Sequence, residues 1–143
     1  MRAGDRLGPF THEITREQLV RYAGASGDFN PIHYDDERAR GFGLPGVIAH
    51  GMLNMGLLGR YLMSALPPGA RFEEYGVRFR AMVRPGDVVT ISGRVEELQH
   101  ADGRARATLA VELAAAPDTP AISGRAVVSW PHDPEEDDIH GKA

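Results

Sequence analysis

The segment from His50 to Leu66 constrains the fold of this chain more than any other part of the sequence. Apolar residues occupy nearly every side of the helix it would form, which is typical of a helix surrounded by other elements. Residues 67–69, Pro-Pro-Gly, then stop the helix. The run is broken by polar residues and is too short for a bilayer, so we expect no membrane span. Its apolar members are Met52, Leu53, Met55, Leu57, Leu58, Leu62 and Met63.

The sequence after residue 70 alternates between apolar and polar positions in four consecutive runs. A period of two is typical of strands that bury one face. Turn residues separate the runs, for example at residues 84–87 and 101–103. Four strands joined in this way predict an antiparallel sheet, and residues 7–14 supply a further strand. The apolar positions of the four runs are Val77, Phe79, Ala81 and Val83, then Val89, Ile91 and Val95, then Ala105, Ala107, Leu109, Val111 and Leu113, then Ile122, Ala126, Val128 and Trp130.

The apolar helix is the one element that can fill the buried face of this sheet. The predicted fold class is therefore α+β, with a curved antiparallel sheet of at least five strands wrapped around one long central helix. Edge strands of such a sheet stay unpaired within one chain, and two copies could pair edge to edge. We therefore expect a homodimer.

The acidity of the chain is concentrated at its C-terminal end. Its 143 residues suit one domain, and its formal net charge is −4, from 16 basic and 20 acidic residues. Residues 131–143 hold five of the acidic residues and one basic residue, so the rest of the chain is neutral. We expect one domain over residues 1–130 and a disordered acidic tail over residues 131–143.

The composition also bears on partners and compartment. No basic stripe interleaved with aromatic residues suggests nucleic acid as a partner. The chain has no cysteine, and its first residues lack the apolar core of a signal peptide. We therefore expect a cytoplasmic protein.

Residues 25–49 form a long segment rich in glycine and proline that follows a short helix. That helix begins at Thr15 with the pattern of a capping box and should end near Gly24. A long loop inside a compact domain is usually functional or disordered. Because this one carries Asp28 and His33, we favour a functional role, although Asp28 alone would also fit an ordinary Asx-turn.

Two short motifs bring together the groups needed for one kind of chemistry. Residues 26–33 read Ser-Gly-Asp-Phe-Asn-Pro-Ile-His, and residues 48–53 read Ile-Ala-His-Gly-Met-Leu at the start of the apolar helix. A carboxylate and an imidazole can transfer protons through one water molecule. The N-terminus of a helix can stabilise a negatively charged oxygen. Together they can add water across a double bond conjugated to a carbonyl group.

These motifs resemble those of the MaoC-like hydratases, and the resemblance spans nearly the whole chain. That family has the hot-dog fold and includes (R)-specific enoyl-CoA hydratases and (3R)-hydroxyacyl-ACP dehydratases. The resemblance implies that Asp28 and His33 are the catalytic dyad and that the Gly51 N–H belongs to the oxyanion hole. It further implies an acyl-CoA or acyl-ACP substrate, and either a homodimer or a heterodimer with a related hot-dog subunit.

Two neighbouring residues have less direct roles. We expect Asn30 to orient the loop or the dyad by hydrogen bonding. His50 stands at the entry to the helix, where it could cap the helix and support the site or contact the substrate. The sequence leaves both readings of His50 open.

Other functions compete with hydration. Hot-dog proteins include thioesterases, in which Asp28 alone could activate water toward a carbonyl carbon, and a non-catalytic acyl-binding subunit is a third reading. We expect no cofactor and no metal. A calcium loop starting at Asp28 would place His33 where glycine is required, and His33 and His50 lack the local spacing of a zinc site.

Two further groups of residues allow two interpretations each. Gly56 and Gly59 could permit close helix packing or leave room for an acyl tunnel. Arg78, Arg80 and Arg84 could form a solvated strand face or contact the phosphates of a pantetheine carrier.

Overall fold

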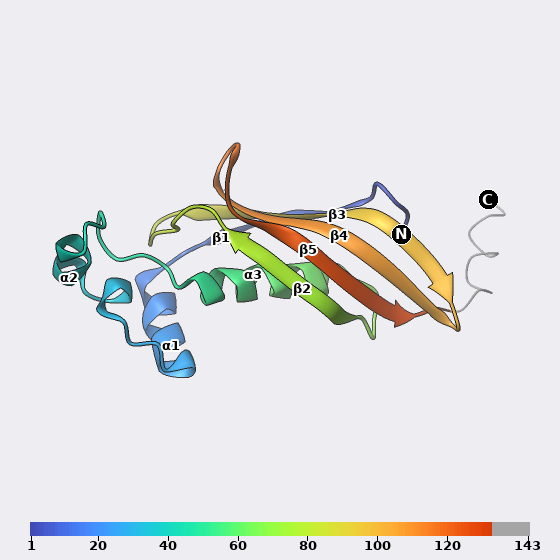
Figure 1. Ribbon diagram of the computed structural model, residues 1–143, viewed down its shortest axis with the longest axis horizontal. Coiled ribbons are helices and arrows are strands. Elements are labelled where there is room, and N and C mark those ends of the chain that lie inside the picture. Colours follow the sequence, from blue (N-terminus) through green and yellow to red (C-terminus); the bar gives the residue numbers. More distant parts are fainter. Residues whose placement is uncertain (133–143) are drawn as a thin grey trace.

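A computed structural model describes residues 1–132 as a curved five-stranded sheet and one central helix (Figure 1). The strand order is β1-β3-β4-β5-β2 and every neighbouring pair is antiparallel, so β1 and β2 are the edges. The predicted fold class is therefore confirmed. The elements are β1 (Arg6–Glu13), α1 (Arg16–Ser26), η1 (Pro31–His33), α2 (Asp36–Gly41), α3 (Gly51–Ser64), β2 (Arg71–Phe79), β3 (Val88–Ala101), β4 (Arg104–Ala116) and β5 (Thr119–Pro131).

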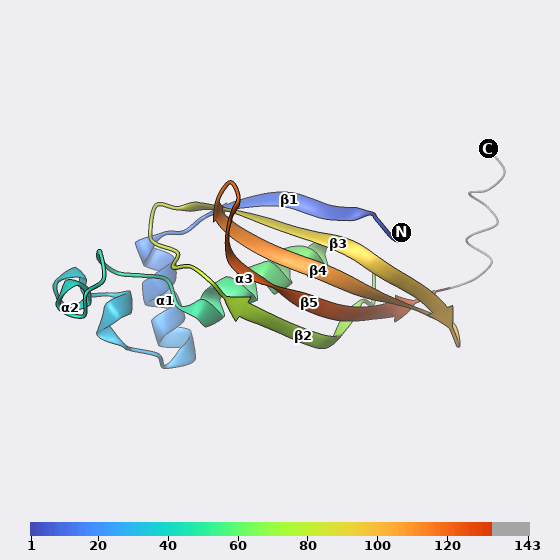
Figure 2. The ribbon, with the colours of Figure 1, turned by 45° about the horizontal axis from the view of Figure 1, so that its top comes forward.

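The core lies between α3 and the concave face of the sheet. The sheet curves over α3, while α1 and α2 gather at the end where α3 begins (Figures 1 and 2). Leu58 and Leu62 of α3 are fully buried, as is Leu109 of β4. Such burial against inward-facing strand residues is the main favourable term in folding. The alternation in the sequence therefore predicted the buried faces of β3, β4 and β5, whereas Phe79 of β2, expected to face inward, is 53% exposed and Ala81 lies exposed beyond the end of that strand.

The sheet covers only one side of α3, which corrects the expectation of a helix surrounded on all sides. The exposed positions Met52, Gly56, Arg60 and Ser64 follow each other at intervals of four and form one stripe along the helix. Met52 is 57% exposed. The sequence pattern misled because a single sheet can enclose only one side of a helix. The stripe is mostly polar or small, so only its first residue, Met52, is an exposed apolar candidate for a contact with another molecule.

The two glycines inside α3 occupy different surroundings. A Cβ atom on Gly59 would lie 3.2 Å from the ring of Tyr75, whereas Gly56 has open space where its Cβ would stand. The Tyr75 hydroxyl donates to the Met55 carbonyl at 2.7 Å, and its ring stacks on Phe72. Burial raises the pKa of Tyr75 to about 12. Gly59 therefore allows close packing of α3 on β2, the first of the two interpretations.

Other boundaries differ from the sequence prediction. The segment 25–49, expected to be irregular, contains η1 and the short helix α2, which begins because Asp35 accepts a hydrogen bond from the Arg38 N–H. The first strand after α3 ends at Phe79, so Val83 lies in a loop but is still buried. No helix within residues 1–132 is long and apolar enough to cross a membrane. The predicted acidic tail lies, from residue 133 onward, outside the described residues.

The one-sided packing of α3 predicts opposite effects for two substitutions in this helix. Leu58→Ala should lower the free energy of unfolding by about 2–5 kcal/mol, because Leu58 is fully buried. Gly56→Ala should raise it by about 0.8–1 kcal/mol, because alanine favours the helix and meets no atom. Urea unfolding of both variants measures these changes in the free energy of unfolding. Comparable destabilisation by both would mean that α3 is enclosed on all sides.

Candidate active site

The loop between α1 and η1 is built by local hydrogen bonds that its residue types favour. Gly27 ends α1 in the left-handed region at φ 75°, and its N–H donates to the Ala23 carbonyl. Asp28 Oδ1 then accepts from the Asn30 N–H at 3.2 Å, and Asn30 Oδ1 accepts from the Ile32 N–H at 3.2 Å. Asp28 thus forms the Asx-turn that the sequence suggested, and Asn30 orients the loop.

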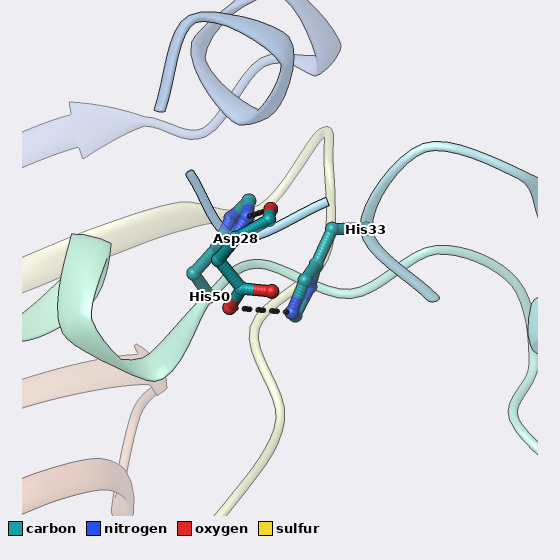
Figure 3. Close-up of side chains that lie close together, drawn as sticks. All are labelled: Asp28, His33 and His50. Carbon is teal, nitrogen blue, oxygen red and sulfur yellow. Dashed lines mark hydrogen bonds and ion pairs between the residues drawn. The ribbon is translucent and has the colours of Figure 1, made fainter. Parts of the chain in front are cut away.

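This local geometry brings Asp28 and His33 together. Asp28 Oδ2 lies 3.7 Å from His33 Nε2, beyond direct hydrogen-bond distance but close enough for both to contact one water molecule (Figure 3). The His33 ring is buried, whereas about half of the Asp28 side chain is exposed. Asp28 therefore uses one oxygen for structure and presents the other to His33.

The tautomer of His33 follows from its second ring nitrogen. His33 Nδ1 lies 2.7 Å from the carbonyl oxygen of Ile48, which can only accept a hydrogen bond. Nδ1 therefore carries the proton and donates it. In the neutral ring, the Nε2 lone pair is then free and faces Asp28, which is the arrangement that a proton-accepting group needs.

His50 contacts both members of the pair. Its ring stacks on His33 with centroids 3.7 Å apart, and its Nε2–H donates to the backbone carbonyl of Asp28 at 3.2 Å (Figure 3). The Tyr22 ring also contacts the His50 ring in an edge-to-face arrangement, with centroids 4.8 Å apart. His50 occupies the N-cap position of α3 but makes no side-chain capping bond. Of its two readings, the contacts fit support of the site.

Burial of His50 lowers its pKa below 6.5, with the neighbouring His33 acting in the same direction. The hydrogen bond to the Asp28 carbonyl opposes this shift but is the smaller effect. His50 is therefore neutral at pH 7, and its Nδ1 atom is buried with no hydrogen-bond partner among residues 1–132.

The N-terminus of α3 lies beside this group of side chains because His50 directly precedes it. Gly51 is the first helical residue, and the first N–H groups of a helix have no acceptor within the helix. With no side-chain cap from His50, these donors stay available to an anionic group. A Cβ on Gly51 would lie 3.0 Å from the ring of Phe79, so glycine lets this ring pack against the start of the helix.

Two residues near the site were not predicted from the sequence. Tyr22 supports His50 from a helix whose spacing marked it only as an inward residue. Asn54 lies in the first turns of α3 and is 4% exposed, and its Oδ1 has no partner among the described residues. Asn54 interrupts an apolar run, and a polar residue buried in such a run is the signal that could have revealed it.

The site holds three potential metal ligands, but their orientation does not favour a metal. Atoms of Asp28, His33 and His50 lie within 4.8 Å of one another. One nitrogen of each ring is already bonded to a backbone carbonyl. A zinc ion must lie near the plane of each imidazole at about 2.0–2.1 Å, which two rings stacked in near-parallel planes do not allow without rotation.

Comparison with known proteins identifies the family. Residues 5–116 match the model of the MaoC like domain. The chain is 36% identical over 128 residues to the 3-hydroxybutyryl-CoA dehydratase of Methylorubrum extorquens, covering 89% of this chain and 80% of that protein. It is 33% identical over 123 residues to the (R)-specific enoyl-CoA hydratase of Rhodospirillum rubrum, covering 82% and 81%.

Comparison with solved structures supports the same family. The (R)-hydratase from A. caviae involved in PHA biosynthesis superposes with a TM-score of 0.83 at 28% identity, covering 92% of this chain and 98% of that one. The chain therefore belongs to the MaoC-like family, and its sheet and central helix form the hot-dog fold. The resemblance expected from the motifs at residues 26–33 and 48–53 is confirmed.

The lowered pKa of His50 predicts a pH dependence of stability. In the unfolded chain His50 takes up a proton near pH 6.5, before it does so in the folded protein. Its contribution to stability is therefore present above that pH and is lost as the pH falls toward the folded-state pKa. Urea unfolding between pH 5 and 8 should show a smaller loss of stability at low pH for His50→Gln than for the unsubstituted protein.

Gln99→Ala provides the control, since Gln99 is exposed, has no titratable group and lies outside the site. It should leave the pH dependence unchanged. Identical slopes for His50→Gln and the unsubstituted protein would contradict the buried, neutral state of His50.

Proposed function

We propose that this protein is an (R)-specific hydratase/dehydratase that interconverts trans-2-enoyl and (3R)-3-hydroxyacyl thioesters. The observation that carries the proposal is the separation of 3.7 Å between Asp28 Oδ2 and His33 Nε2 beside the uncapped start of α3. The relatives named 3-hydroxybutyryl-CoA dehydratase and (R)-specific enoyl-CoA hydratase support the reaction class. These relatives favour hydration and dehydration over thioester hydrolysis.

The dyad would hold the reacting water. The Asp28 carboxylate and His33 Nε2 both accept hydrogen bonds, so a water between them donates both of its hydrogens. Its lone pairs then point away from the dyad, toward a substrate carbon. This orientation turns an ordinary water molecule into a positioned nucleophile.

In hydration, a proton would pass from the water to the dyad and a proton would pass from the dyad to the substrate. The water oxygen bonds to the β-carbon while one member of the dyad takes a proton from it. The electron pair of the double bond shifts toward the thioester carbonyl, and the α-carbon then receives a proton from the dyad. The dyad ends in its starting state, and dehydration runs the same steps in reverse. Since the two groups share one proton-transfer network, we treat them as a coupled pair and leave base and acid unassigned.

The start of α3 would stabilise the negative charge that develops on the carbonyl oxygen. The Gly51 N–H is the donor we assign to this oxyanion hole, and the positive end of the helix dipole adds to it. Asn30 would fix the conformation of the loop through its hydrogen bond from the Ile32 N–H. His50 would hold the backbone of Asp28 and the ring of His33. The contacts described above support the roles of Asn30 and His50.

The carrier and the assembly are part of the same proposal. The thioester would be acyl-CoA or acyl-ACP, and matched substrates of each kind with one acyl chain would distinguish them. For the assembly, we propose a homodimer through the free edge of β2. Large apolar residues stay exposed at the end of the molecule where β2 meets α3, among them Met52, Phe79 and Met82. Burying them would also shield the site from water.

Sedimentation analysis tests this assembly. We expect a species of about twice 15.5 kDa at assay concentration. A monomer with full activity would contradict it. A subunit found active only with a related partner chain would replace the homodimer by the heterodimer.

The dyad predicts the effect of removing either member. Asp28→Asn and His33→Ala should each lower kcat for hydration of crotonyl-CoA by at least about 100- to 10,000-fold, because each removes a proton-transfer group. Loss of absorbance of the conjugated thioester measures the rate, and the configuration of the 3-hydroxy product reports the stereochemistry. Circular dichroism should show an unchanged fold.

Asp102→Asn and His100→Ala are matched controls, because both residues are exposed in or beside the β3–β4 turn. They should retain normal rates. Near-normal turnover by either dyad variant would defeat the proposal. Release of free thiol without a 3-hydroxy product would favour a thioesterase, and tight binding without turnover would favour an acyl-binding subunit.

A further inference from the structure

Asn54 is a buried polar residue to which the proposed reaction gives no role. It lies in the first turns of α3 and is 4% exposed, and its side-chain Oδ1 atom has no hydrogen-bond partner among residues 1–132. Most buried polar side-chain atoms in proteins have such a partner, so an exception requires a physical explanation. The position of Asn54, four residues after His50, suggests one.

Asn54 and His50 lie one helical turn apart. The Asn54 N–H donates to the His50 carbonyl at 3.2 Å. Residues four positions apart lie on the same face of a helix, with Cβ atoms about 5–6 Å apart. Leu58 and Leu62 continue this face toward the other end of α3, and both are fully buried. His50 and Asn54 are thus neighbouring polar side chains on the buried face of the helix.

Both side chains have an unpaired acceptor. His50 Nε2 lies 3.2 Å from the backbone carbonyl of Asp28, which can only accept, so Nε2 carries the proton of the neutral ring. His50 Nδ1 is then an acceptor, and it is buried without a partner within residues 1–132. The Oδ1 atom of Asn54 can also only accept. Since two acceptors cannot bond to each other, a group that donates two hydrogens is needed between them.

We propose that a buried water molecule bridges His50 Nδ1 and Asn54 Oδ1, and that this water makes Asn54 a positioning residue of the dyad. The water donates one hydrogen to each acceptor. Buried waters commonly satisfy polar groups that the chain leaves unpaired. Because Nδ1 accepts from the water, the proton of the ring stays on Nε2. The effect on rate rests on the proposed hydration reaction, whereas the bridge itself does not.

The bridge links Asn54 to both members of the dyad. The His50 ring stacks on His33 with centroids 3.7 Å apart and bonds to the carbonyl of Asp28 (Figure 3). Without a donor at Nδ1, rotation of this ring or transfer of its proton from Nε2 to Nδ1 is less strongly opposed. Either change breaks the bond to Asp28 and alters the separation of 3.7 Å between Asp28 and His33. A displacement of about 1 Å at reacting groups can lower a rate about 100-fold.

The NMR spectrum of His50 tests the bridge without any turnover. Asn54→Leu removes the acceptor, whereas Asn54→Thr keeps an oxygen that can accept. In the 15N-labelled full-length protein, the ring nitrogens of His50 are identified by their loss in His50→Phe. A hydrogen bond to an unprotonated ring nitrogen moves its 15N resonance toward that of a protonated nitrogen. We expect Asn54→Leu to move the Nδ1 resonance the opposite way and Asn54→Thr to leave it near its original position.

The rate of crotonyl-CoA hydration tests the positioning role. We expect Asn54→Leu to lower kcat about tenfold with KM unchanged, because Asn54 does not contact the substrate in this proposal. Asn54→Thr should recover most of the rate. In the background of His50→Phe, which keeps an aromatic ring without Nδ1, Asn54→Leu should have no further effect.

Thr108→Val is the matched control, because Thr108 is another buried polar residue, 6% exposed, on β4. It should leave kcat unchanged. A residue that only stabilised the fold would change the free energy of unfolding but not kcat of the folded protein. Circular dichroism should show an unchanged fold for each variant.

Three outcomes would overturn the proposal. The first is an Nδ1 resonance that does not respond to Asn54→Leu, and the second is an unchanged kcat in that variant. The third is an equal loss of kcat on adding Asn54→Leu to the unsubstituted protein and to His50→Phe, because Asn54 would then act independently of His50. A failure of the proposed function is distinguishable, since it would abolish hydration by the unsubstituted protein and leave the response of the His50 spectrum intact.

Discussion

Two hydrogen bonds between the dyad loop and the segment that leads into α3 set the geometry of the site. The Ile48 N–H donates to the Ile32 carbonyl at 3.0 Å, and His33 Nδ1–H donates back to the Ile48 carbonyl at 2.7 Å. The segments they join are separated in sequence by α2 and its flanking turns. Because of this reciprocal pair, the His33 imidazole and the start of the helix are positioned as one unit.

This tie also explains why His50 matters although it does not face the reacting water in our proposal. Its ring stacks on His33, and its Nε2–H holds the Asp28 backbone, so both dyad residues depend on one buried imidazole. A charged His50 would repel a charged His33. The burial that lowers the pKa of His50 therefore keeps the support neutral while the dyad exchanges protons.

The sequence predicted the fold and the members of the site more fully than their surroundings. Alternation and the apolar helix sufficed for the sheet and its partner, because both patterns report burial directly. The two motifs named Asp28, His33, His50 and Gly51, and the fold brings all four to one end of α3. Missing from the prediction were α2, whose short helix depends on the cap from Asp35, and the open stripe along α3. A six-residue helix is too short to show a periodic pattern. The open stripe did leave a signal, because Gly56, Arg60 and Ser64 recur at intervals of four within the apolar run.

The two faces of the sheet have different surroundings. The concave face packs on α3 and carries the apolar core, and the outer face carries a hollow of about 910 Å³ whose lining includes Arg94 and Arg125. Of the exposed stripe on α3, Met52 lies at the start of the helix beside the site, and the second copy that we propose would pair along the free edge of β2. In our proposal, the chemistry therefore takes place at the start of α3 and the assembly uses the free edge of β2.

The central claim is that the Gly51 N–H and the dyad act on the same thioester, and a pair of variants at one position tests it most directly. Gly51→Pro removes the N–H, and proline suits the first position of a helix and the extended backbone of His50 before it. Gly51→Ala adds the same Cβ but keeps the donor. With folding of both verified by circular dichroism, the account predicts that kcat for crotonyl-CoA hydration is about 100- to 1000-fold lower for Gly51→Pro than for Gly51→Ala. Equal rates for the two variants would contradict it.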